Sequence, residues 1–96
     1  MNSNNSEHVQ NLFKAFVHLD NIEAVDAFLQ DICTPREIQD MAQRLQVAKL
    51  LANETSYTTI QEQTGASATT IARVSRALQY GPKGYKPVLD FLSEEE

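Results

Sequence analysis

Hydroxyl and guanidinium side chains are concentrated in one short segment of the second half of the chain. Ser67, Thr69 and Thr70 are followed by Arg73 and Arg76. Short hydroxyl side chains let a helix approach a DNA groove closely, and arginine reaches guanine edges or the phosphate backbone. The segment therefore favours contact with duplex DNA. The candidate DNA-binding residues are Ser67, Ala68, Thr69, Thr70, Ala72, Arg73 and Arg76.

The distribution of charge supports this interpretation. The net charge of the chain is −5, which on average disfavours a polyanionic partner. Residues 63–89, however, contain Arg73, Arg76, Lys83 and Lys86 and no acidic residue. A basic segment without acids inside an acidic protein indicates a local electrostatic role, and nucleic-acid binding fits it.

Metal binding and catalysis have little support in the sequence. His8 and His18 are ten residues apart on one expected helix, and neither has a cysteine or a second histidine at metal-ligand spacing. Glu37 and Asp40 are three residues apart on an expected helix, and Arg44 follows Asp40 by one turn, which is typical of an exposed ion-pair face. We expect no enzyme activity, no metal and no cofactor.

Composition predicts one small domain in the cytoplasm. Ninety-six residues, 42% of them hydrophobic, support a single modest core. The only cysteine, Cys33, excludes an internal disulfide and fits a reducing compartment, where it would serve as a small apolar side chain. No run of about 20 apolar residues suits a membrane helix, and the polar start of the chain lacks the apolar core of a signal peptide.

Apolar side chains that recur at steps of three and four predict an all-α fold of about six helices. The expected helices span residues 7–19, 21–32, 35–52, 56–64, 67–80 and 85–92. They form a single domain over residues 7–92, between a flexible N-terminus (1–6) and an acidic tail (93–96). The clearest start signal is Thr34-Pro35-Arg36-Glu37, which has the residues of a reciprocal capping box.

Residues 56–80 are predicted to form a helix-turn-helix. Gly65 can supply the positive φ of the sharp turn, and Ile60, Ala66, Ile71 and Val74 can hold the two helices together. This pattern predicts a DNA-binding regulator whose second helix enters the major groove. A helical protein–protein interaction module without DNA binding is the alternative, because the same geometry also packs ordinary helical domains.

The sequence resembles the tryptophan-repressor family of bacterial transcription factors. The resemblance covers about residues 9–92 and is carried by Thr34-Pro35, Leu50-Leu51, Gly65-Ala66 and the stretch SATTIARVSRAL at 67–78. The segment from Leu78 to Tyr85 resembles the YerC/YecD branch. The resemblance implies an intertwined homodimer and a repressor that binds a nearly palindromic operator.

The resemblance also implies an effector pocket. Arg44 and Arg73 match the two arginines that hold the corepressor in the tryptophan repressor. Val74 stands where that protein has glycine, and Ala77 stands where it has a serine hydroxyl. The methyl groups of Val74 should fill the space of an indole ring. We therefore expect a small-molecule effector, if one binds at Arg44, Arg73 and Val74, to differ from tryptophan.

Overall fold

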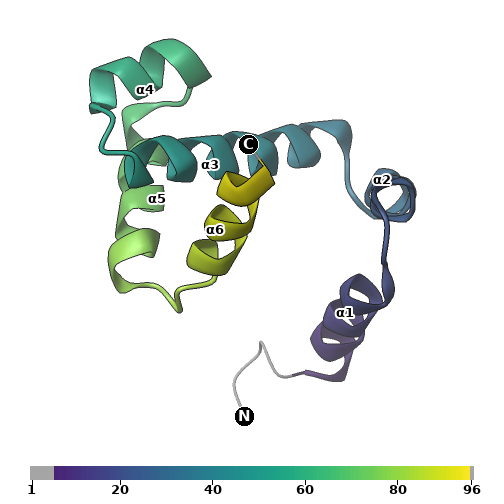
Figure 1. Ribbon diagram of the computed structural model, residues 1–96. Helices are drawn as coiled ribbons and strands as arrows, with labels where there is room; N and C mark the ends of the chain where they lie inside the picture. The colour runs from purple at the N-terminus through teal and green to yellow at the C-terminus, as the bar shows by residue number, and fades with distance from the viewer. Residues whose placement is uncertain (1–5, 96) are drawn as a thin grey trace. The chain divides into compact units, whose positions relative to one another are not determined.

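The computed structural model describes residues 6–95, and over that range the chain forms six α-helices and no strand (Figure 1). The helices are α1 (Glu7–His18), α2 (Ile22–Ile32), α3 (Pro35–Ala52), α4 (Tyr57–Thr64), α5 (Ala68–Tyr80) and α6 (Tyr85–Glu95). The all-α prediction is confirmed, and the first five helices end within about one residue of their expected limits.

Both ends of the chain differ from the prediction. The helix expected to stop near residue 92 continues through Glu95, so Ser93 and the glutamates after it extend α6. Glutamate is a good helix former, and no glycine or proline interrupts this stretch. Ser6 is the N-cap of α1 and not part of a flexible end. The remaining residues of the expected flexible N-terminus, 1–5, and the last residue of the tail, 96, lie outside the described part.

Hydroxyl or amide side chains cap the start of four helices in the same way. Ser6, Asn21, Ser56 and Ser67 each accept a hydrogen bond from the backbone N–H three residues later, at 3.2, 2.8, 3.2 and 3.1 Å. The predicted capping box opens α3: Glu37 N–H donates to Thr34 Oγ1 at 3.1 Å, and Thr34 N–H donates to Glu37 Oε1 at 2.8 Å. Each such cap stabilises its helix by about 1 kcal/mol.

The described chain forms two compact units, and the boundary between them in the sequence falls within α3. The first ends at Ile38 and contains α1, α2 and the first turn of α3. Within it, the rings of Phe16 and Phe28 pack edge to face with centroids 5.6 Å apart. Neither α1 nor α2 contains a buried residue.

The second unit begins at Gln39 and holds the buried core. In Figure 1, α4 lies above the C-terminal half of α3 and α6 lies below it, and α5 runs downward past the C-terminal end of α3. The core residues come from α3, α4, the following turn and α5, and each is at most 4% exposed: Val47, Ala48, Ile60, Ala66, Ile71 and Val74. Leu78 packs against this core, as the helical period predicts.

Left-handed backbone ends two helices of the second unit. Gly65, at φ +73°, follows α4, and Glu54, at φ +61°, follows α3. The Glu54 N–H donates to the Leu51 carbonyl, and the Thr55 N–H donates to the Leu50 carbonyl, both at 3.0 Å. These bonds satisfy carbonyls at the end of α3, but Glu54 occupies a position that usually favours glycine.

We predict opposite stability changes at these two turns. Glu54→Gly should raise the free energy of unfolding by about 1 kcal/mol, because it relieves the left-handed strain. Gly65→Ala should lower it by a similar amount, although an added Cβ there meets no atom within 4 Å. Urea unfolding at one protein concentration measures both changes. Shifts of the same sign would contradict this account.

Candidate nucleic-acid interface

Helices α4 and α5 form the predicted helix-turn-helix, joined by residues 65–67. The fully buried Ile60 and Ile71 pack in the shared core. The Thr64 hydroxyl donates to the Ile60 carbonyl at 2.7 Å and accepts from the Ala66 N–H at 3.0 Å, so one side chain braces the turn. Gln43 on α3 donates to the Thr64 carbonyl at 3.2 Å. The turn is therefore fixed both internally and to α3.

The two helices start with the same local pattern, Ser-x-Thr-Thr-Ile, at residues 56–60 and 67–71. In each copy the serine oxygen accepts from the N–H of the second threonine. The two side-chain hydroxyls also bond to each other, at 3.0 Å for Ser56 with Thr59 and 3.1 Å for Ser67 with Thr70. Sequence analysis did not identify this repeat, although its spacing of eleven residues is visible in the sequence.

The repeated cap separates the candidate hydroxyls into two kinds. Ser67 and Thr70 bond to each other and to the helix start, so their hydroxyls stabilise α5. Thr69 is exposed, and its hydroxyl has no partner among residues 6–95. Thr69 is therefore the candidate hydroxyl that is free to meet a ligand.

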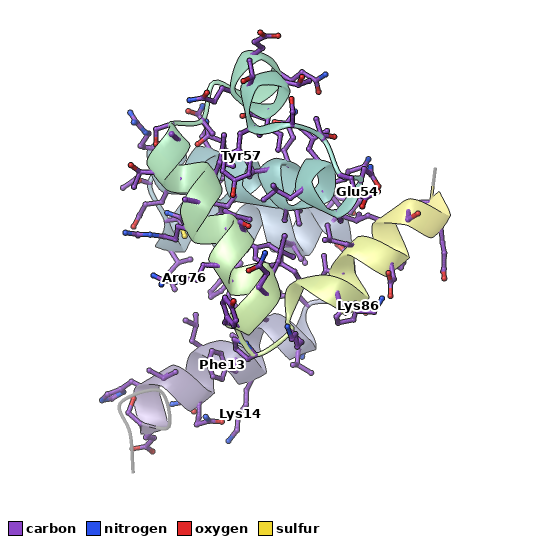
Figure 2. The ribbon with its side chains drawn as sticks, turned by 90° about the vertical axis from the view of Figure 1, so that its left-hand side faces the viewer. Phe13, Lys14, Glu54, Tyr57, Arg76 and Lys86 are labelled. Atoms are coloured by element: carbon purple, nitrogen blue, oxygen red, sulfur yellow. The ribbon has the colours of Figure 1, made fainter. Side chains whose placement is uncertain are left out.

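Buried residues determine which face of α5 is exposed. Ile71 and Val74 are 0% and 2% exposed and point into the core. Residues on the opposite side are consequently solvent-facing. Figure 2 shows the Arg76 side chain extending outward from α5. The predicted DNA-binding residues on this exposed surface are Ala68, Thr69, Ala72, Arg73 and Arg76.

Tyr80 extends the exposed face and was missed by sequence analysis. It is 80% exposed at the end of α5 and follows Thr69, Arg73 and Arg76 at steps of four, three and four. A tyrosine hydroxyl can donate to a phosphate oxygen. The helical period contains this signal, because Tyr80 continues the spacing of Thr69, Arg73 and Arg76.

Only two of the four basic residues in the 63–89 segment lie on this face. The Lys83 ammonium donates to the carbonyls of Leu78 and Gln79 at 3.0 and 2.7 Å, which caps the C-terminus of α5. Lys86 forms an ion pair with Asp90 at 3.2 Å on α6. Arg73 and Arg76 are exposed on α5, with no partner within the described range.

The expected effector residues line none of the three cavities near the α5–α6 turn and the end of α3. Arg44 and Arg73 are exposed, and Val74 lies in the core. Three cavities of about 330 to 400 Å³ lie near the α5–α6 turn and the end of α3, and none is lined by these residues. The most apolar one, about 400 Å³, is lined by Leu45, Ala77, Pro82, Lys83, Gly84, Tyr85 and Val88.

Residues 6–95 show neither a membrane span nor a grouped set of metal ligands. No helix there is both long enough and apolar enough to cross a bilayer. No three histidine, cysteine, aspartate or glutamate side chains in that range are grouped so that they could hold a metal ion.

Comparison with known proteins identifies the family. The model of the Trp repressor protein family matches residues 7–93. The uncharacterized protein YerC of Bacillus subtilis is 41% identical over 90 residues, which are 94% of this chain and 86% of that protein.

Two solved structures share the fold. A TrpR-like protein from Eubacterium eligens superposes with a TM-score of 0.92 at 40% identity, covering 97% of this chain and 96% of its own. A protein from Staphylococcus aureus described as a proposed Trp repressor gives 0.87 at 42% identity, covering 92% and 88%. By sequence and by structure, the chain belongs to the Trp repressor protein family.

Proposed function

We propose that the protein is a sequence-specific DNA-binding regulator of transcription, and specifically a repressor. The main support is the exposed face of α5, where Arg73 and Arg76 have no partner in the described part of the chain while Ile71 and Val74 are buried. Membership of the Trp repressor family supports the same activity. Such a regulator would act where the chromosome is, in the cytoplasm of a bacterium.

In this proposal α5 enters the major groove and α4 crosses the backbone beside it. Thr69 and Ala72 lie on the part of α5 that would face the base edges. Arg73 and Arg76 would reach phosphates or guanine, and Tyr80 would donate to a phosphate beyond them. The Lys83 cap would keep the last turn of α5 helical, since its charge opposes the negative end of the helix dipole.

We further propose that the regulator is a homodimer. Helices α1 and α2 bury no residue, and Phe13, Val17 and Ile22 are 49%, 85% and 83% exposed. Apolar side chains at this density need a partner surface. A second copy would supply it and would also provide a second helix-turn-helix for the other half of a palindromic site.

The dimer predicts a mass in solution of twice the 10.8 kDa of the chain. Light scattering at micromolar concentration measures this directly. Charge substitutions in the exposed apolar face, such as Val17→Glu with Ile22→Glu, should lower the mass. A monomer of unmodified protein at that concentration would contradict the dimer.

The dependence of DNA affinity on salt tests the roles of the basic residues. Each phosphate contact contributes about 0.9 to the slope of log affinity against log salt. If Arg76 contacts a phosphate in each subunit, Arg76→Ala should reduce the slope of the dimer by about 1.8. Fluorescence anisotropy with a selected operator measures the slope.

Lys86→Met is the matched control for this measurement. It removes one positive charge from the same segment, but from a side chain paired with Asp90, so the slope should stay unchanged. Equal effects of the two substitutions would show that the charge of the segment acts without regard to position. If the protein does not bind DNA, or binds it with an affinity that does not depend on salt, the result would instead favour the helical protein–protein interaction module.

Tryptophan should not act as an effector, because Val74 occupies the core beside Arg73. A ligand that binds only the folded state raises the melting temperature, by an amount set by its concentration and affinity. We predict no shift in melting temperature with millimolar tryptophan. Saturable micromolar binding by calorimetry would contradict this prediction.

A further inference from the structure

The first two turns of α5 expose methyl groups where sequence analysis expected several hydroxyl donors. Ser67 and Thr70 commit their hydroxyls to each other and to the start of the helix. Ala68 and Ala72 are exposed and carry only a methyl group. Thr69 is exposed and carries both a methyl group and a hydroxyl without a partner in the described range.

The position of these methyl groups is fixed by the core. Ile71 lies between Thr69 and Ala72 in the sequence and Val74 follows Ala72. Both are buried in the core that α5 shares with α3 and α4, so α5 cannot rotate without exposing them. Thr69 and Ala72 are three residues apart on the outward side, and Arg73 and Arg76 continue the same face. A duplex that meets both arginines would therefore also meet the methyl groups.

The 5-methyl group of thymine is the characteristic apolar group in the major groove, and alanine and threonine methyls are its usual protein contacts. We infer that α5 recognises thymine methyl groups, through Thr69 Cγ2 first and Ala72 Cβ second. The half-site then carries A·T pairs opposite the first two turns of α5. This inference rests on the proposed DNA-binding function and adds the chemistry by which bases are read.

The test begins with selection of random duplexes by the full-length protein, which supplies a bound sequence. Each thymine of one half-site is then replaced by deoxyuridine, which removes the methyl group and leaves every hydrogen-bonding group in place. Replacement at one or two positions should weaken binding about fourfold each, the value of one buried methyl group. The other thymines should tolerate the replacement.

Two substitutions separate the methyl group of Thr69 from its hydroxyl. Thr69→Val keeps a methyl group at the Cγ2 position and should still distinguish thymine from deoxyuridine at the contacted position. Thr69→Ser keeps the hydroxyl but loses the methyl group in both subunits. The dimer should therefore bind about 16-fold more weakly, about fourfold for each half-site, and no longer distinguish thymine from deoxyuridine at the contacted position. Melting temperatures of both variants report whether the fold is retained.

Thr58 provides a matched control, because it occupies the same place in the Ser-x-Thr-Thr-Ile pattern of α4 and is also exposed. Thr58→Ser should leave the deoxyuridine effect intact. Two results would overturn thymine recognition alone. In one, the protein binds a specific sequence but no deoxyuridine replacement weakens binding. In the other, Thr69→Val no longer distinguishes thymine from deoxyuridine and Thr69→Ser still does. Selection that enriches no sequence would overturn the proposed function as well.

Discussion

The burial of Ile60, Ile71 and Val74 in one core with α3 is the interaction on which the candidate site depends. Together with Val47 and Ala48, these side chains form the small core of the second unit. Burying aliphatic side chains of this size stabilises a fold by about 1.5 to 3 kcal/mol each. The same contacts fix the rotation of α5 about its axis, so the hydrophobic effect determines which polar residues face outward.

Local hydrogen bonding then decides what those outward residues can do. The hydroxyls of Ser67 and Thr70 are hydrogen-bonded at the start of α5. The Lys83 ammonium is hydrogen-bonded to carbonyls at its end. What remains on the exposed face of α5 is a short methyl-bearing segment followed by two arginines and a tyrosine. A helix that is capped at both ends and packed through its apolar side is already ordered before it binds. Binding through its exposed face would therefore cost little conformational entropy.

Sequence predicted the helices well because their signals are local. Three predicted signals depend on residues at most four apart, and the structure contains all of them. They are the capping box of Thr34 and Glu37, the Ser67 cap and the Gly65 turn. The end of α6 at Glu95 differs from the predicted end near residue 92, because a run of acidic residues is also typical of a solvated tail. The caps and breakers that mark other helix ends are absent there.

The site was predicted less completely, because partners depend on side-chain geometry. Residues 63–89 contain four cations, but Lys83, whose backbone has φ +68°, donates to carbonyls at the end of α5, a contact that the charge count does not indicate. The sequence likewise offers three hydroxyl donors, Ser67, Thr69 and Thr70. Of these three, only Thr69 has no hydrogen-bond partner within residues 6–95. Tyr80 followed the helical period, but its 80% exposure emerges only from the fold.

The most direct test of this account is nuclear magnetic resonance of the methyl groups of α5 during titration with a selected operator. The central claim is that the buried side orients the helix and the opposite side meets DNA. The methyl signal of Thr69 and those of Ala68 and Ala72 should then shift strongly. The signals of Ile71 and Val74 should move little, because their core contacts persist in the complex. Large shifts of Ile71 and Val74 with an unchanged Thr69 signal would contradict the assigned face of α5.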